Sequence, residues 1–153
     1  MEHVFKMIDP IDLKVLEALK DDSRATVRKI AKKINLPVTT VHNRLQKLKK
    51  EQIIKKFTIE PDYEKLNRPV FVFVSAVVDH QKLVDRKTGI ETLKKKLRAV
   101  SGVERIYALT GDVDLILLVR LESIKELDQF LVKELRNIDG IVKTTTQIVL
   151  EDG

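Results

Sequence analysis

The second half of the chain repeats one short pattern. Residues 97–103 read LRAVSGV and residues 135–141 read LRNIDGI, an offset of 38 residues. In each copy a helix-forming stretch ends near a glycine, Gly102 or Gly140, and a β-rich stretch begins. Glycine suits this place because helix C-caps and tight turns often require a positive φ. The repeat therefore predicts two helix-to-strand units in the second half.

The residues around the repeat complete this arrangement. Apolar and alternating runs predict strands over residues 70–79, 103–110, 114–121 and 141–150, and helical periodicity predicts helices over residues 88–100 and 123–137. Ser123 followed by Glu126 is a capping box for the second helix. Strand–helix–strand, present twice and joined by a hairpin, is the ferredoxin-like βαββαβ fold.

The first predicted strand is apolar on both alternations, since Phe71 and Phe73 interleave with Val72 and Val74. Two helices can cover only one face of the sheet, and a strand with a solvated face normally alternates with polar residues. We therefore expect a second copy of the chain to cover the other face, which predicts a homodimer.

The first half carries helix signals in close succession. Asp9-Pro10 suits a helix start, and Ile11, Val15, Leu16 and Leu19 supply an apolar face. Thr26 can cap a second helix, and a break at residues 35–37 precedes a third at about residues 38–50. Two short helices joined by a tight turn, after a supporting helix, form a helix-turn-helix. Residues 53–59 (IIKKFTI) predict a strand or wing.

Together these patterns predict an α+β protein with two domains. A winged helix-turn-helix domain would occupy residues 1–60, a polar linker with two prolines residues 61–69, and a ferredoxin-like domain residues 70–153. The whole net charge of +6 lies in residues 1–69, which hold 16 basic and 10 acidic residues, because residues 70–153 hold 13 of each. Residues 24–56 alone carry eleven bases and one acid, an arrangement that suits the phosphates of double-stranded DNA.

The helix-turn-helix assigns roles to these residues. The second helix of the pair should enter the major groove through its N-terminal part, and the first should meet the sugar–phosphate backbone. Thr and Asn can bond base edges, and Arg44 can fork onto a guanine or clamp a phosphate. The predicted DNA-binding residues are Arg28, Lys29, Lys32, Val38, Thr39, Thr40, His42, Asn43, Arg44 and Lys47. The alternative, a basic face that is merely solvated, is weakened by the coincidence of helix spacing, charge and polar outer face.

Composition excludes several classes of function. The absence of cysteine rules out disulfides, thiolate catalysis and cysteine-based metal sites, and the few aromatic residues weaken a single-strand-binding role. No signal peptide is seen and the apolar runs are too short to span a bilayer, so we expect a soluble cytoplasmic protein without a membrane partner. No catalytic residue, metal ligand set or cofactor site is predicted, because the chain lacks motifs such as HExxH or a glycine-rich phosphate loop.

The ordered motifs resemble those of the Lrp/AsnC, or feast/famine, transcription regulators. The resemblance runs from Ile8 to Leu150. It rests on the I-D-x-x-[VI]-L-x-x-L pattern of residues 11–19, the Asp22 and Arg24 pair, Arg44 in the third helix, the wing at residues 53–57 and the TGDVD sequence at residues 110–114. It implies dimers on palindromic operators, often assembled further into octamers, and amino-acid effectors bound between ferredoxin-like domains.

The resemblance also implies where an effector would bind. Its hairpin signature places Thr110, Gly111, Asp112 and Asp114 in the site, with Ser101, Gly102 and Thr146 as weaker candidates. The alternative is purely structural, since Gly-Asp is a common pair in tight turns.

Two positions depart from the family pattern. Pro37 replaces the usual capping serine at the start of the third helix, and Gln52 replaces the usual glycine before the wing, which leaves the geometry of that turn open. Two alternative functions on the same fold also stay open: an amino-acid-sensing metabolic protein that does not bind DNA, and an enzyme that resembles tetrapyrrole decarboxylases. The enzyme would need His or Arg in a pocket of the second half, and His80 is the only histidine among residues 70–153 of the sequence.

Overall fold

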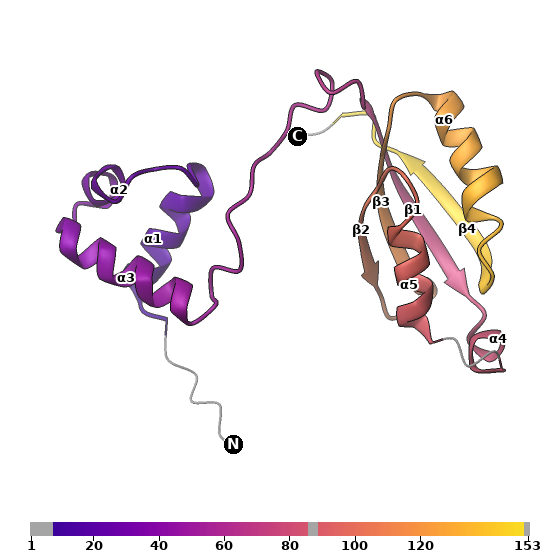
Figure 1. The fold of residues 1–153 in the computed structure, drawn as a ribbon, viewed down its shortest axis with the longest axis horizontal. Coiled ribbons are helices and arrows are strands. Elements are labelled where there is room, and N and C mark those ends of the chain that lie inside the picture. Colours follow the sequence, from indigo (N-terminus) through magenta and orange to yellow (C-terminus); the bar gives the residue numbers. More distant parts are fainter. Residues whose placement is uncertain (1–7, 86–88, 152–153) are drawn as a thin grey trace. The chain divides into compact units, whose positions relative to one another are not determined.

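The computed structural model describes residues 8–85 and 89–151 and divides the chain into two compact units, Met1–Glu60 and Pro61–Gly153 (Figure 1). Each unit has its own hydrophobic core. Within the described residues, no helix is long and apolar enough to cross a membrane.

The first unit consists of α1 (Pro10–Asp21), α2 (Val27–Ile34) and α3 (Val38–Lys50). The predicted start of α1 is confirmed, because an Asp9 carboxylate oxygen accepts hydrogen bonds from the backbone N–H groups of Ile11 and Asp12, each at 2.9 Å. Thr26 caps α2 as predicted by accepting from the Lys29 N–H. The buried core comprises Val15, Ala18, Leu19, Ile30, Ala31, Val41 and Leu48. This three-helix cluster holds α2 and α3 in the helix-turn-helix arrangement.

The segment after α3 differs from the prediction, because residues 53–59 form no strand. Ile53 and Ile54 pack half-buried against the core, whereas Phe57 and Ile59 are exposed. A strand needs a neighbouring strand for its backbone hydrogen bonds, and residues 8–60 of this structure contain no other strand. High β-propensity alone therefore did not produce a wing strand in the single chain.

The turn between α3 and this segment accommodates Gln52 at the position where the sequence pattern suggested a glycine. Gln52 adopts a left-handed conformation with φ of 56°. This is the conformation that glycine adopts readily and a side chain adopts at a cost. The turn therefore holds a residue with a side chain in a strained backbone conformation. At the other end of α3, Pro37 makes no side-chain capping hydrogen bond, as expected.

The second unit contains one four-stranded antiparallel sheet. Its elements are β1 (Val70–Val78), α4 (His80–Asp85), α5 (Ile90–Arg98), β2 (Val103–Ala108), β3 (Leu115–Leu121), α6 (Ile124–Gln129), η1 (Phe130–Leu135) and β4 (Ile141–Ile148). The strand order is β2-β3-β1-β4, with Val74 of β1 opposite Leu117 of β3 and Thr146 of β4. This arrangement confirms the predicted ferredoxin-like βαββαβ fold.

One face of this sheet carries the core of the unit. Val72, Val74 and Ala76 of β1 are fully buried in a cluster with Leu93 and Leu97 of α5 and with residues of α6 and η1. The residues of β1 that point to the other face, among them Phe71 and Phe73, are only half-buried. The prediction that helices cover a single face is thus confirmed. On the opposite face, the apolar residues of β1 have both apolar and polar neighbours, since Phe71 pairs with Arg120 and Phe73 with Leu118 and Gln147.

The helices of the second unit differ in detail from the predicted ranges. α5 ends at Arg98, and the predicted start at residue 88 lies outside the described residues. α4 is an additional short helix. The predicted helix over residues 123–137 divides into α6 and the π-helical η1, where the Arg136 N–H donates to the Leu131 carbonyl five residues earlier. Phe130 and Leu135 lie at the two ends of this π segment, and both are buried.

The predicted glycine turns are confirmed, with φ of 85° at Gly102 and 97° at Gly140. Ser123 caps α6 as predicted, accepting from the Glu126 N–H. The segment predicted as a linker, residues 61–69, is partly fixed to the second unit. The Arg120 guanidinium carbon lies 4.2 Å from the Tyr63 ring centroid and 3.8 Å from that of Phe71. The Tyr63 ring thereby packs against the Arg120 side chain of β3.

Candidate nucleic-acid interface and ligand site

A hollow on the surface of the first unit is lined by residues at the starts of α2 and α3. Its lining contains no acidic residue and consists of Thr26, Val27, Arg28, Val38, Thr39, His42 and Asn43. Thr39, His42 and Asn43 are exposed on the first two turns of α3, and Thr40 is half-buried. The helix start therefore presents hydroxyl, imidazole and amide groups beside the Arg28 guanidinium. These groups can donate to and accept from base edges and phosphates.

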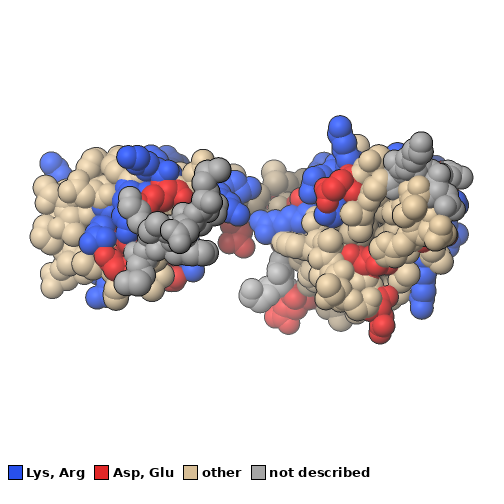
Figure 2. All heavy atoms as spheres, turned by 90° about the horizontal axis from the view of Figure 1, so that it is seen from below, with Lys and Arg blue, Asp and Glu red and all other residues tan. Residues whose placement is uncertain are grey.

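The basic residues of α2 fall into two groups. Lys29 pairs with Asp22 at 2.6 Å and Lys33 pairs with Asp21. The hydrogen bond from Lys29 is the main reason why the pKa of Asp22 lies below its usual value. Arg28 and Lys32 make no ion pair within residues 8–85 and 89–151. Acidic side chains accordingly lie among the basic ones on the face of the first unit shown in Figure 2.

Arg44 and Lys47 do not lie on the open outer face where we expected them. An Arg44 guanidinium nitrogen lies 2.6 Å from an Asp9 carboxylate oxygen and 3.5 Å from one of Asp12, and the Lys47 ammonium lies 2.6 Å from the other Asp12 oxygen. Asp12 has no exposed surface, whereas the side chains of Arg44 and Lys47 are 30% and 25% exposed. The reason is electrostatic, because a buried carboxylate requires a partner of opposite charge.

Asp9 and Asp12 thus have a role that their sequence positions did not reveal. Asp9 caps α1 and pairs with Arg44, and its pKa is lowered first by the Asp12 backbone N–H and further by the Arg44 charge. Asp12 occurs on the inner side of α1, three residues before the buried Val15. This placement of an acid in an apolar stripe was the one available signal. The cluster of Asp9, Asp12, Arg44 and Lys47, here named the α1–α3 clasp, fixes the third helix to the first.

In the second unit, Asp114 is also used to hold the fold. One of its carboxylate oxygens accepts from the Val78 N–H at 2.7 Å, and the other lies 2.8 Å from His80 Nε2. The hydrogen bond from the Val78 N–H is the main reason why the pKa of Asp114 lies below its usual value, and the hydrogen bond with His80 lowers it further. These contacts join the end of the β2–β3 turn to the end of β1 and the start of α4. Asp114 is therefore less available to a ligand than its place in the hairpin sequence indicated.

The other predicted effector residues do not come together within one chain. Thr110, Gly111 and Asp112 are exposed at the tip of the β2–β3 turn, and Gly111 has φ of 115°. Ser101 and Gly102 lie at the opposite end of β2, about 20 Å away for a strand of six residues. Thr146 lies on β4, at the other edge of the sheet.

Gly102 has a packing role of its own. A Cβ added there would lie 2.6 Å from a Leu121 methyl carbon and 2.8 Å from the Arg120 carbonyl oxygen. The glycine thus allows the α5–β2 loop to approach β3, which explains its place in the repeat.

Comparison with known proteins agrees with both units. Residues 8–55 match a family described as winged helix-turn-helix DNA-binding, and residues 70–152 match the Lrp/AsnC ligand binding domain. The HTH-type transcriptional regulator LysM of Saccharolobus solfataricus is 36% identical over 145 residues, which cover 94% of each chain. An HTH-type transcriptional regulator of Pyrococcus furiosus is 34% identical over 143 residues, covering 94% of this chain and 93% of that protein.

Solved structures show the same two-unit fold. LrpC of B. subtilis superposes with a TM-score of 0.79 at 28% identity, over 95% of this chain and 96% of that one. E. coli AsnC gives a TM-score of 0.78 at 28% identity, over 95% and 94%. The family match spans the whole ferredoxin-like domain, and the relatives align over nearly the entire chain. This protein is therefore a member of the Lrp/AsnC family of DNA-binding, ligand-modulated transcription regulators.

Proposed function

We propose that the protein binds palindromic DNA as a homodimer, that the hollow between α2 and α3 reads the operator, and that an amino acid modulates this binding. The observation that carries the proposal is the convergence of Arg28, Thr39, His42 and Asn43 on one hollow without acidic residues. A helix start with short polar side chains fits the depth of the major groove, and a neighbouring arginine can fix its register on phosphate.

Within this proposal the residues have different roles in DNA binding from those assigned from the sequence. Thr39, His42 and Asn43 face bases, and Arg28 and Lys32 face the phosphate backbone. Lys29 can exchange Asp22 for a phosphate, because exposed ion pairs contribute little net stability. Arg44 and Lys47 contribute indirectly, since the α1–α3 clasp sets the orientation of α3.

The salt dependence of DNA binding tests the first part. With about 6–10 phosphates neutralised per dimer, log K against log salt should fall with a slope of about −5 to −9. Asn43→Ala should weaken binding to the selected operator by about 1–3 kcal/mol and relax base preference, whereas Lys32→Ala should weaken all sequences similarly and make the slope shallower. Lys20→Ala on α1, where Lys20 pairs with Glu17, is the matched control. Binding that is insensitive to salt would contradict the proposal.

The half-buried apolar residues on the open face of the sheet support the homodimer. Phe73 of β1 lies opposite Leu118 of β3, and the Phe71 and Phe73 ring centroids are 5.0 Å apart. A second copy can cover this apolar surface by two-fold symmetry. Sedimentation should show a dimer at micromolar concentration, and Phe73→Lys should shift it toward the monomer. A wild-type monomer under these conditions argues against the interface.

The separation of the candidate effector residues supports a ligand site built from more than one copy. The turn tip at Thr110–Asp112 and the loop at Ser101 and Gly102 lie at opposite ends of β2, so one small molecule reaches both only across a subunit boundary. A Neisseria meningitidis regulator of the same fold, with a TM-score of 0.85 at 21% identity, was solved as an L-Met complex. Calorimetry with a panel of amino acids should give heat with the wild type and less with Asp112→Asn. No heat with any amino acid at millimolar concentration would sink this part.

A further inference from the structure

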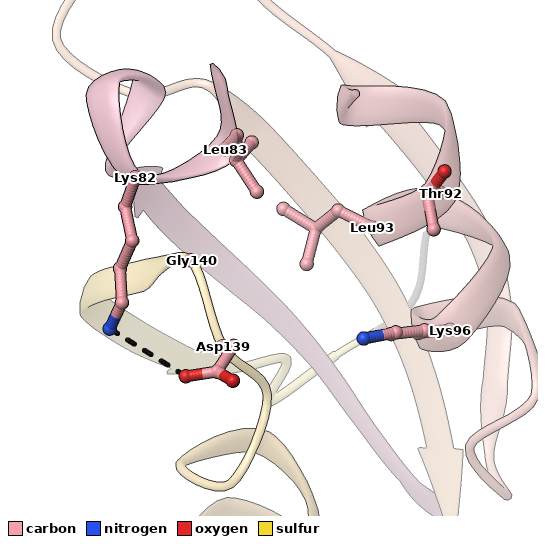
Figure 3. Close-up of a pocket in the computed structure, with 7 residues that line it drawn as sticks. All are labelled: Lys82, Leu83, Thr92, Leu93, Lys96, Asp139 and Gly140. Atoms are coloured by element: carbon pink, nitrogen blue, oxygen red, sulfur yellow. Dashed lines mark ion pairs between the residues drawn. The ribbon is translucent and has the colours of Figure 1, made fainter. Parts of the chain in front are cut away.

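A pocket in the second unit lies within a single chain, and none of the candidate hairpin residues is among its lining residues. It has a volume of about 240 Å³ and lies between α4, α5 and the turn before β4 (Figure 3). Its lining residues are Lys82, Leu83, Thr92, Leu93, Lys96, Asp139 and Gly140. Pockets for drug-sized ligands typically span roughly 300–1,000 Å³, so this one suits a molecule with only a few carbons.

The floor of the pocket is apolar. Leu83 and Leu93 are 7% and 2% exposed and belong to the core of the unit. Gly140 has positive φ, and a Cβ there would lie 2.8 Å from a Leu83 methyl carbon. The glycine therefore allows the turn before β4 to approach α4 closely. The floor is part of the packed fold, so a ligand would meet a preformed surface.

The rim of the pocket is charged, with two ammonium groups and one carboxylate. Lys82 Nζ lies 3.6 Å from an Asp139 carboxylate oxygen, and both side chains are about half exposed. Lys96 makes no ion pair within the described ranges, and its side chain extends from α5 toward the side of the pocket where Asp139 lies (Figure 3). Thr92 lies one turn earlier on the same wall of α5. The rim thus has a net positive charge next to an apolar floor.

We propose that this pocket binds a small aliphatic carboxylate, with the carboxylate at Lys96 and the hydrocarbon on Leu83 and Leu93. An ammonium and a carboxylate form a charge-assisted hydrogen bond, and the leucine floor favours an alkyl group over a hydrated anion. Inorganic phosphate has no hydrocarbon to pack against the leucines, and the Asp139 carboxylate repels it. The ammonium groups of Lys82 and Lys96 disfavour a simple cation. The proposal does not depend on the hairpin effector site or on a second copy of the chain.

Two sources of this chemistry can be distinguished. The ligand is either an α-amino acid, whose ammonium would approach Asp139 in place of Lys82, or a carboxylate without that ammonium, which would leave the Lys82–Asp139 pair intact. Leucine, its 2-oxo acid and 4-methylpentanoate share one branched carbon skeleton and form a matched series. The amide of 4-methylpentanoic acid is the uncharged control.

Calorimetric titration of the full-length protein with this series tests the proposal. At least one carboxylate should bind and the amide should not. Lys96→Met retains the stem without the charge and should weaken binding about tenfold or more, because a hydrogen bond between charged groups is lost. Lys96→Arg should largely keep binding. Lys95→Met, on the adjacent exposed position of α5 outside the pocket, is the matched control and should bind as the wild type does.

Several results would contradict the proposal that this pocket binds a carboxylate. One is the absence of binding by every carboxylate at millimolar concentration, and another is equal affinity in Lys96→Met and Lys95→Met, both shown to be folded by circular dichroism. Binding that is lost in Asp112→Asn but kept in Lys96→Met would place the ligand in the hairpin instead. Failure of DNA binding or of the hairpin site would leave these titrations unchanged. Either ranking of leucine and its 2-oxo acid supports the carboxylate site, and the ranking identifies the source.

Discussion

The two units each hold their fold together with an aspartate, but they give it different surroundings. In the first unit Asp12 has no exposed surface and forms ion pairs with Arg44 and Lys47. In the second unit Asp114 is 20% exposed and is held by a backbone N–H and by His80. Charged residues of α3 and of the β2–β3 turn thus serve to join elements of the fold, and the burial of the aspartate determines how much stability depends on each contact.

Removal of the buried charge should have the largest effect. Asp12→Asn keeps the shape of the side chain but leaves Arg44 and Lys47 without their counter-charge. Because both cations still reach solvent, we expect a loss of about 3 kcal/mol in the free energy of unfolding, at the lower end for broken buried pairs. Urea unfolding followed by far-ultraviolet circular dichroism measures it. Asp21→Asn, which breaks the exposed pair with Lys33, is the control and should cost less than about 0.5 kcal/mol. Similar losses in both variants would remove the contrast between the units.

In the second unit, stability should be most sensitive to substitution at Gly102, where the backbone approaches β3 closely. Gly102→Ala adds a Cβ at 2.8 Å from a carbonyl oxygen that belongs to a central strand, in a backbone with φ of 85°. We expect a loss of about 2–3 kcal/mol from the combined strain and clash. Gly111→Ala has φ of 115° but meets no atom within 4 Å, so conformational strain alone should cost about 1 kcal/mol. Thermal unfolding of the two variants compares them, and equal losses would show that the clash relaxes.

Acid should weaken the Asp114 contacts. The pKa of Asp114 is lowered in the folded protein, so its contribution to stability is present above the usual value of 3.8 and is lost as the pH falls through the lower folded value. Asp114→Asn should therefore lower the melting temperature at neutral pH and change it much less at a pH well below 3.8. A melting-temperature difference that is the same at both pH values would show that the carboxylate charge is not what holds the turn.

The smallest expected effect is a gain in stability. Gln52→Gly relieves a left-handed backbone at the end of the first unit but also increases the freedom of the unfolded chain. We expect a net gain of about 0.5 kcal/mol, with Gln52→Asn in between because asparagine tolerates this conformation. Chemical denaturation of the three proteins provides the ranking. A loss in Gln52→Gly would indicate that the Gln52 side chain contributes contacts that outweigh the strain.

Local signals in the sequence predicted most of the fold. The capping residues Asp9, Thr26 and Ser123 mark helix starts, and the repeat around Gly102 and Gly140 predicted the order of helices and strands. The short α4 and the π-helical turn lack such signals. The candidate sites were less predictable, because Arg44 and Lys47 pair with Asp12 across 32 and 35 residues, and Asp114 reaches Val78 across 36. Side-chain partners at such separations depend on tertiary packing, which no local pattern specifies.

The Tyr63 contact determines the reach of the connector between the units. The Thr58 carbonyl accepts a hydrogen bond from Ser23, and Tyr63 stacks with Arg120, so only the four residues 59–62 lie between these anchor points. Such a span extends at most about 17 Å, and Pro61 stiffens it. In the proposed dimer, so short a tether would keep the second helix-turn-helix unit close once the first has bound DNA. The effective concentration of that unit would then be high for half-sites within reach and would fall sharply for wider spacings.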